Sequence, residues 1–262
     1  MFSIIIFNNS NSSNCYNSIL RQTYQDYEII SPKKGNRAEA FNEGIKNAIG
    51  NYVLFLENSD ILEDRALEII DSMIDEQDVI IYDLINYDIK GNVEILHVNP
   101  YYTSSRNLVK ELIKERYIGS ICNKAFKLDY LRKNNIRFES LPKYLEDNLF
   151  CIKAFYKDIS YKWIDFPLCQ TVYTTRNITI QNASAFLKYT EYILKIMKSL
   201  NYNDDKFILQ KKLECLNYRA FRTRDFNKQL RTPISAIFKL NCCIRKKIEL
   251  SIICLLNSIH VI

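Results

Sequence analysis

The stretch Tyr52-Val53-Leu54-Phe55-Leu56-Glu57-Asn58-Ser59-Asp60 places acidic residues directly behind an apolar run. The run from Tyr52 to Leu56 is typical of a β-strand that is buried on both faces. Similar short apolar runs predict further strands at Ser3–Phe7, Tyr27–Ile30 and Val79–Ile85. Helices are predicted between them at Cys15–Arg21, where Ile19 and Leu20 should point inward, at Glu39–Ile49, which Gly50 should end, and at Glu63–Ile74.

This alternation of strands and helices predicts an α/β fold with a mostly parallel sheet flanked by helices. Ligands of such sheets bind beyond the carboxyl ends of the strands. The candidate site is therefore formed by the segments that follow Phe7, Ile30 and Leu56. A less regular stretch comes next, and after it the pattern predicts a helix at Glu146–Tyr156, strands at Ile159–Ile164 and Leu168–Tyr173, and mainly helix from Ala183 onward.

The composition fits one α/β domain with a helical appendage, because the chain has 262 residues and 47% of them are apolar. Eight cysteines without a CxxC pair, and an apolar start too short for a signal peptide, indicate reduced thiols in a cytoplasmic protein. The two histidines, His97 and His260, are far apart in the sequence, so each is expected to be a packing or surface residue. The absence of a GxGxxG turn argues against a dinucleotide-binding dehydrogenase.

Five stretches resemble, in order, the motifs of the family 2 glycosyltransferases of GT-A type. They are Ser18–Ile30, similar to S-I-L-x-Q-T-Y-x-D-x-E-I-I; Ala40–Tyr52, similar to A-R-N-x-G-I-x-x-A-x-G-x-Y; Phe55–Leu62, where the family has F-L-D-x-D-D; Asn123–Phe138; and Glu146–Phe150, similar to E-D-x-x-F. The run Pro167–Arg176 resembles the strand that closes the family's domain. The resemblance implies a GT-A domain at residues 1–180 and leaves residues 181–262 as a helical, basic C-terminal region.

The resemblance also implies an activity, the transfer of a sugar from a nucleotide-sugar donor to a surface polysaccharide, capsule, lipopolysaccharide or lipid-linked glycan. The attacking hydroxyl must lose a proton to a general base, and the leaving diphosphate gains charge that Mg²⁺ or Mn²⁺ can neutralise. By resemblance to the family's acidic pair, Asp147 is the expected base of a single inverting displacement. It is expected to be exposed, in the first turn of its helix.

The other expected site residues follow from the same resemblance. Glu57 and Asp60 are expected to hold the metal, and the nucleotide sugar is expected to contact Asn8, Arg37, Glu57 and Glu146. Most of these residues have an alternative interpretation. Glu146 and Asp147 could cap their helix, Glu57 and Asp60 could be exposed acids of a strand-end turn, and Arg37 could be a solvated loop charge, as could Lys33 and Lys34.

The sequence departs from the family pattern at two places. Ser59 stands where the family has its central metal-binding aspartate. After Ile30, the segment Ser31–Asn36 replaces the family's V-D-D-G-S, whose first aspartate contacts the nucleotide base, and the first loop is reduced to Phe7-Asn8-Asn9. These departures keep a second class of function open, a catalytically inactive GT-A-like protein that binds a glycan or a partner enzyme.

Positive charge is concentrated in the C-terminal third. The segment Lys206–Glu249 contains 12 Lys and Arg against 3 Asp and Glu, whereas the whole chain has a net charge of +6. Apolar residues between Ile234 and Ile259 fall near one helical face, beside Arg245-Lys246-Lys247. Such a helix can lie on the anionic inner face of the plasma membrane or pack on its own domain. No nucleic-acid-binding motif accompanies the charge, so no nucleic-acid partner is expected.

Overall fold

The computed structural model describes residues 1–7, 13–32, 35–87, 91–97, 104–113, 119–157, 159–172, 183–202, 207–208 and 211–212. The chain divides into two compact units, Met1–Arg176 and Asn177–Ile262. The two units are described separately below.

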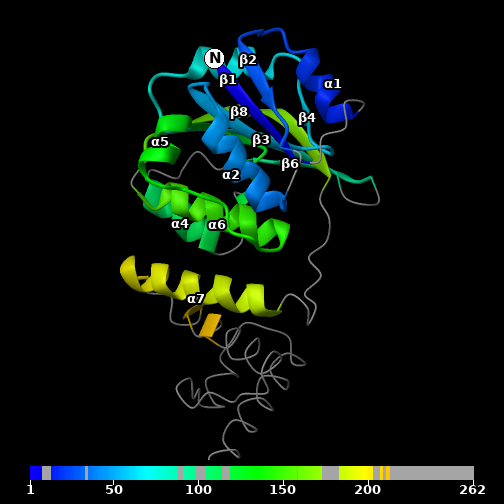
Figure 1. Ribbon diagram of the computed structural model, residues 1–262. Helices are drawn as coiled ribbons and strands as arrows, with labels where there is room; N and C mark the ends of the chain where they lie inside the picture. Colours follow the sequence, from blue (N-terminus) through cyan, green and yellow to red (C-terminus); the bar gives the residue numbers. More distant parts are fainter. Residues whose placement is uncertain are drawn as a thin grey trace, which may run out of the picture. The chain divides into compact units, whose positions relative to one another are not determined.

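Within the described residues, unit 1 is built on an eight-stranded mixed sheet (Figure 1). The strands lie in the order β2-β1-β3-β7-β5-β8-β4, and β6 pairs with β5. Strands β1, β2, β3, β5 and β8 run in one direction, and β4, β6 and β7 run against them. The bounds are β1 Phe2–Phe7, β2 Tyr27–Ile30, β3 Tyr52–Glu57, β4 Ile61–Leu62, β5 Val79–Tyr87, β6 Val93–Leu96, β7 Lys124–Lys127 and β8 Tyr161–Val172.

Helices connect these strands, as the alternating pattern predicts. They are α1 Asn14–Leu20, α2 Arg37–Asn47, α3 Ala66–Met73, α4 Ser105–Ile113, α5 Leu128–Lys133 and α6 Lys143–Phe155. In Figure 1, α2 lies in front of the sheet, with α5 to its left and α4 and α6 below. The fold is therefore a mixed α/β layer structure, as expected from the sequence.

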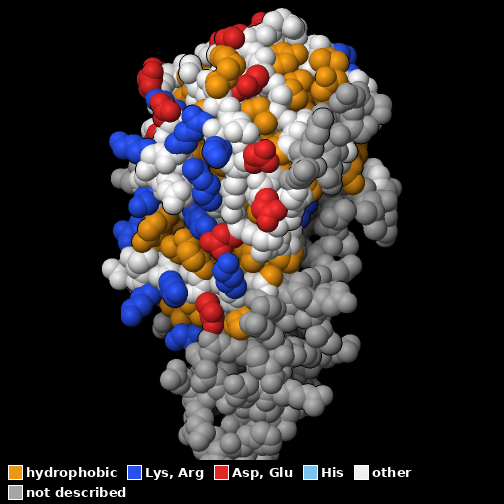
Figure 2. Space-filling view, in the orientation of Figure 1, with side chains coloured by type: hydrophobic (Ala, Val, Ile, Leu, Met, Phe, Trp, Pro, Cys, Tyr) orange, Lys and Arg blue, Asp and Glu red, His pale blue; other side chains and the backbone are white. Residues whose placement is uncertain are grey.

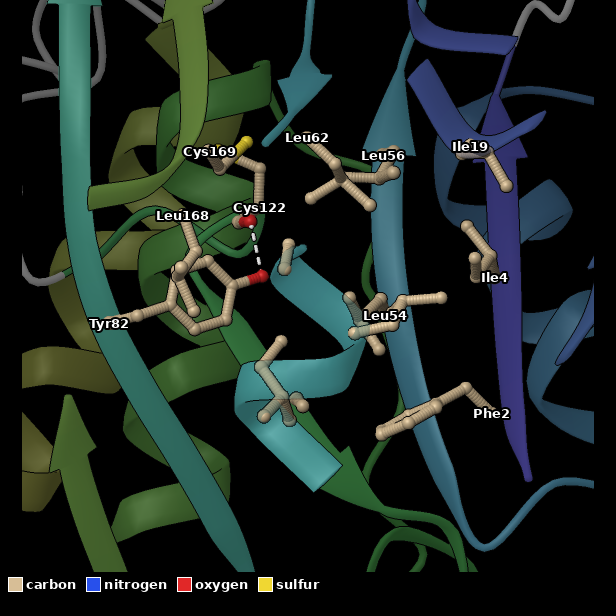
Figure 3. Packing of buried hydrophobic residues seen from close by; sticks show 14 of the residues in the cluster. Phe2, Ile4, Ile19, Leu54, Leu56, Leu62, Tyr82, Cys122, Leu168 and Cys169 are labelled. Atoms are coloured by element: carbon tan, nitrogen blue, oxygen red, sulfur yellow. Dashed lines mark hydrogen bonds between the residues drawn. The ribbon is translucent and has the colours of Figure 1, made fainter. Parts of the chain in front are cut away.

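The two faces of the sheet carry different cores. On one face, buried side chains of α1 and α3 join strand residues such as Leu54 and Tyr82 in one core cluster (Figure 3). The Tyr82 hydroxyl donates a hydrogen bond of 2.9 Å to the Cys122 carbonyl, which satisfies a polar group inside this core. On the other face, the core is a cluster of aromatic rings from α2, β3, β7, α6 and the loop between α5 and α6, formed by Phe41, Phe55, Phe126, Phe150 and Phe138.

Several expectations about the elements were wrong in detail. Leu20 is 54% exposed, because α1 ends there and only Ile19 of the pair points into the core. The stretch that looked irregular contains β6, α4, β7 and α5. The two strands expected after α6 are one strand, β8, which a bulge interrupts. Helix α2 begins at Arg37 rather than Glu39 and ends at Asn47, before Gly50.

Of unit 2, the structure describes α7 (Ala183–Ser199) and a few residues after it. No helix among the described residues has the length and apolarity needed to span a membrane. The basic segment Arg245-Lys246-Lys247 and the apolar face beside it lie outside the described residues.

Candidate active site

The first residue of α2 is the centre of the candidate site. Asn36 caps this helix, since its side chain accepts a hydrogen bond of 3.0 Å from the Glu39 backbone N–H and the Glu39 carboxylate accepts one from the Asn36 N–H. Arg37 therefore begins the helix with a defined backbone. Its guanidinium carbon lies 4.7 Å from the centroid of the Phe41 ring, and its side chain is only 10% exposed. The Phe41 ring thus supports the guanidinium from within the aromatic core.

Glu57, the last residue of β3, makes the first ion pair with Arg37. The Arg37 Nε donates a hydrogen bond of 2.9 Å to Glu57 Oε1. The ammonium of Lys143, the first residue of α6, lies 3.0 Å from the same oxygen. Burial opposes ionisation of Glu57, but Arg37 and Lys143 outweigh it and lower the pKa of this carboxyl.

Two further carboxylates come from α6. The Arg37 Nη1 donates a short hydrogen bond to Glu146 Oε1. The Arg37 Nη2 lies 2.6 Å from Asp147 Oδ1, in a third ion pair. Glu146 and Asp147 are both buried. One guanidinium therefore joins three carboxylates, from residues up to 110 positions apart in the sequence (Asp147 against Arg37).

The burial of these acids changes their protonation. Burial raises the pKa of Glu146 to about 7, although the charge of Arg37 acts in the opposite direction. Burial likewise raises the pKa of Asp147. Burial also disfavours the charge on Arg37, but Asp147, Glu57 and Glu146 more than compensate and raise the pKa of its guanidinium. A carboxylate with a raised pKa is a stronger proton acceptor once it is ionised, so Asp147 and Glu146 have the chemistry of a general base.

Asp60 lies beside this cluster without contacting Arg37. One of its carboxylate oxygens accepts a hydrogen bond of 2.8 Å from the Glu57 backbone N–H, and the other accepts one of 2.5 Å from the Thr171 hydroxyl. Burial raises the pKa of Asp60 to about 6. Asp60 therefore stabilises the turn after β3 and connects this turn to β8.

The surroundings of Glu57 and Asp60 do not fit a divalent cation in this arrangement. Glu57 is paired with two cationic side chains, and both Asp60 oxygens accept hydrogen bonds. Ser59, which has no charge, is exposed. A hard divalent ion needs oxygen ligands that are free to bind it and negative charge that is not already neutralised.

The structure brings Arg37, Glu57, Glu146 and Asp147 together, whereas Asn8, Lys33 and Lys34 lie outside the described residues. One expectation about Asp147 was wrong: it is only 6% exposed and lies in the second turn, because α6 begins at Lys143. Lys143 was missed as a site residue. Its spacing of three from Glu146 and four from Asp147 would have placed the three side chains on one helical face. Basic and acidic side chains are intermixed on the face that carries α2 and α5 (Figure 2).

No protein-family model matches the sequence. The chain is 27% identical over 141 residues to TarP of Staphylococcus aureus strain N315, a poly(ribitol-phosphate) beta-N-acetylglucosaminyltransferase. This match covers 48% of the chain and 38% of TarP, so the chain spans well under half the length of that relative.

Solved structures decide the fold. The crystal structure of Staphylococcus aureus TarS residues 1–349 with UDP-GlcNAc matches with a TM-score of 0.57 and 16% identity, over 91% of this chain and 80% of that one. The chain has the GT-A-type fold of TarS. A second structure of the same TarS fragment, with UDP, matches with a TM-score of 0.55 over 95% of this chain and 77% of that one. The GT-A fold positions the ends of β1, β2 and β3 on one edge, where the Arg37 cluster lies.

Proposed function

We propose that this chain is a glycosyltransferase that moves a sugar from a nucleotide-sugar donor to a glycan of the bacterial surface. One observation carries the proposal: Glu57, Glu146 and Asp147 meet on Arg37 at the carboxyl edge of the parallel strands. Parallel sheets bind their ligands at this edge. The likeness to TarS bound to UDP-GlcNAc, and to TarP, supports UDP-GlcNAc as the donor and a polyol-phosphate polymer as the acceptor.

In the proposed reaction, Asp147 takes the proton of the attacking hydroxyl. The hydroxyl oxygen forms a bond to the anomeric carbon while the bond to the diphosphate oxygen breaks, which inverts the anomeric configuration in one step. Arg37 holds the Asp147 carboxylate in place. Arg37 and Lys143 also supply positive charge toward the leaving diphosphate, because guanidinium and ammonium groups both bind phosphate oxygens.

The Mg²⁺ or Mn²⁺ expected at Glu57 and Asp60 stays a prediction, and no step above depends on it. A bound ion would neutralise charge on the leaving diphosphate. Ser59 supplies no negative charge, so an ion there would need the donor phosphates as its main ligands. Calorimetric titration of Mn²⁺ into the chain, with and without UDP, tests this dependence on the donor phosphates. Mn²⁺ binding that occurs only when UDP is present supports it, and no Mn²⁺ binding in either case excludes the ion from the proposed reaction.

Peripheral contact with an anionic membrane also stays a proposal, supported by the basic residues Arg245, Lys246 and Lys247. It would place the enzyme at the inner face of the plasma membrane, near lipid-linked acceptors. Sedimentation with anionic vesicles at low and high salt is the test. Binding that does not fall with added salt would exclude an electrostatic attachment.

The enzyme proposal is tested by substituting the base. Asp147→Asn should lower the rate of UDP release from UDP-GlcNAc in the presence of acceptor by a factor of about 100 or more, because an amide cannot accept the proton. Asp129→Asn is the matched control, since Asp129 is an exposed aspartate in the first turn of α5. Circular dichroism checks that both variants are folded. Equal rates in wild type and Asp147→Asn would remove Asp147 as the base.

A specific observation favours the second candidate, a GT-A-like protein that binds a nucleotide or glycan without catalysis. The chain's own cations already neutralise the carboxylates that a transferase would use. Calorimetry separates the two functions when combined with the rate measurement. Binding of UDP-GlcNAc without turnover by the wild-type chain, in the presence of polymer and Mn²⁺, would favour the second.

A further inference from the structure

A second group of polar side chains lies on β5, β6 and β8, away from Arg37. At its centre is Asp83, a fully buried aspartate in the middle of β5. Its Oδ1 accepts a hydrogen bond of 3.1 Å from the indole N–H of Trp163, and its Oδ2 lies 2.5 Å from His97 Nδ1. His97 Nδ1 also lies 4.0 Å from Asp165 Oδ1. The sequence predicts only a packing or surface role for His97, whereas the structure places its ring beside two carboxylates.

The sheet itself creates this convergence. The β5–β6 ladder pairs Leu84 with Leu96, so His97 continues the register to the position opposite Asp83. On the other side of β5, Ile164 pairs with Tyr82 but Pro167 pairs with Asp83. Asp165 and Phe166 are thus the extra residues of a bulge in β8. Bulges redirect side chains out of the regular alternation of a strand, which is how Asp165 comes to lie near His97.

We propose that Asp83, His97 and Asp165 bind a transition-metal dication, with Zn²⁺ as the best-fitting ion. Each residue offers one ligand atom, and these atoms lie within 4.8 Å of one another. Zn²⁺ with ligand bonds of about 2.0–2.1 Å places its tetrahedral ligands about 3.4 Å apart. The distance of 2.5 Å between His97 Nδ1 and Asp83 Oδ2 would have to lengthen, and that of 4.0 Å between His97 Nδ1 and Asp165 Oδ1 would have to shorten, each by less than about 1 Å.

The composition of the group selects the kind of ion. Two carboxylates balance the charge of a dication, and an imidazole nitrogen favours Zn²⁺, Co²⁺ or Ni²⁺ over Mg²⁺ or Ca²⁺. Asp83 is fully buried, and buried carboxylates are commonly paired with a cation or bound to a metal. The Trp163 N–H would then hold the ligand Asp83 from behind, as outer hydrogen bonds commonly do for metal ligands.

An ion can reach the group without disturbing the core. The side chains of His97 and Asp165 are 61% and 71% exposed, so both can move toward an arriving ion while Asp83 stays fixed. In the sheet, β7 lies between β5 and β3, the strand that ends at Glu57. This inference does not depend on the proposed function, because none of its residues contacts Arg37.

The chain contains one tryptophan, and that residue reports on the site. Trp163 donates its N–H to Asp83, so a bound paramagnetic ion should quench its fluorescence. The full chain, stripped of metal with a chelator, is titrated with Co²⁺ while Trp163 fluorescence and the visible absorption of Co²⁺ are followed. We expect saturable quenching with a matching absorption band, both reversed when Zn²⁺ displaces Co²⁺.

Variants locate the ion. His97→Ala and Asp165→Asn should each weaken Co²⁺ binding at least tenfold, and the exposure of both side chains should leave the fold intact by circular dichroism. Asp64→Asn, at another exposed aspartate, and Glu57→Gln, in the Arg37 site, should bind as wild type does. Absence of saturable binding at millimolar Co²⁺ would overturn the proposal, and so would unchanged binding in both ligand variants. Loss of binding in Glu57→Gln alone would also overturn it, because the ion would then belong to the Arg37 site.

Discussion

Arg37 is in a position that helix energetics alone disfavours. A positive charge at a helix N-terminus opposes the helix dipole, and acidic side chains are preferred there. Glu57, Glu146 and Asp147 explain the exception, since they place three carboxylates around this one cation. Residues that break a local rule are often functional, because the fold compensates for them elsewhere. The position of Arg37 at the start of a helix therefore marks the candidate active site.

Replacing Arg37 should show how much free energy the burial of the three carboxylates costs when they lack this partner. Arg37→Ala leaves three carboxylates without their shared partner, and we expect a loss of about 3–5 kcal/mol in the free energy of unfolding at pH 8. The loss should be smaller at pH 5, because Glu146 and Asp147 have raised pKa values and can take up protons instead. Urea denaturation at the two pH values measures both effects. A loss under about 1 kcal/mol at pH 8, typical of an exposed pair, would contradict the described cluster.

Glu146 predicts a pH dependence of stability with a definite sign. Burial raises its pKa to about 7 in the folded chain, whereas in the unfolded chain the value is about 4.3. The folded state therefore binds the proton more tightly, and the stability that this provides is complete below about pH 4 and is lost as the pH rises through about 7. The free energy of unfolding should fall from pH 5 to pH 8.

Glu146→Gln should remove that part of the fall. We expect the decrease between pH 5 and pH 8 to shrink by about 2 kcal/mol, since the amide does not titrate. Asp60, whose pKa is raised to about 6, should keep a smaller dependence of the same sign in the variant. Denaturant titrations of both proteins at several pH values provide the comparison. An identical slope in the two proteins would mean that Glu146 titrates normally.

At the scale of the element, the position of α2 on β1 determines where Arg37 lies. The helix packs closely because Gly44 faces Ile5: a Cβ added at Gly44 would lie 2.5 Å from Ile5 Cγ2. Asn36 caps the same helix and so fixes the position of its first residue, Arg37, which contacts the carboxylates. The helix is therefore held at both its start and its middle, and the guanidinium is held with it.

Gly44→Ala should strain this contact. The added methyl group must push either the Ile5 side chain or α2 away, so we expect a loss of about 1–3 kcal/mol in the free energy of unfolding. Lys46→Ala is the matched control in the same helix, because Lys46 is exposed. Ile5→Ala removes all three atoms that the added methyl group would meet, so Gly44→Ala should cost less free energy in that background than in the wild type. Urea denaturation of the wild type, the three single variants and the Gly44→Ala/Ile5→Ala double variant is the measurement, and a neutral Gly44→Ala would show that α2 does not pack as described.

The elements show which parts of the fold can be predicted from sequence. Strands β1 and β3 were predicted closely, because a strand buried on both faces leaves an unbroken apolar run. The bounds of β2 were also predicted, although this edge strand is only half-buried. The strand β6 was missed because Val93 and Ile95 are exposed, so no buried pattern marks it. Leu20 was assigned to the core because a short helix gives too few turns to distinguish its faces. The bulge in β8 made one strand look like two, since it interrupts the alternation at Asp165 and Phe166.

In unit 1 as a whole, the order of the strands brings residues that are distant in the sequence together in one site. Arg37 and Glu146 are 109 positions apart and meet because α2 and α6 both begin beside Glu57, the last residue of β3. Motif resemblance predicted the acids, but not their shared partner or their burial, since both depend on where α2 and α6 pack. The same sheet places His97 opposite Asp83 through the β5–β6 register, a pairing that sequence spacing does not reveal.

Transfer of the sugar to an acceptor is the most direct test of the proposed glycosyltransferase function. Wild-type chain is incubated with UDP-GlcNAc and a short poly(ribitol phosphate) acceptor, with and without Mn²⁺, and nuclear magnetic resonance follows the anomeric proton of the product. We expect one UDP to be released per sugar transferred and the glycosidic bond to have inverted configuration. Asp147→Asn should form product more slowly, by a factor of about 100 or more, at the same protein concentration. A product with retained configuration would contradict the single displacement, and absence of both transfer and donor binding by the folded wild-type chain would contradict the glycosyltransferase itself.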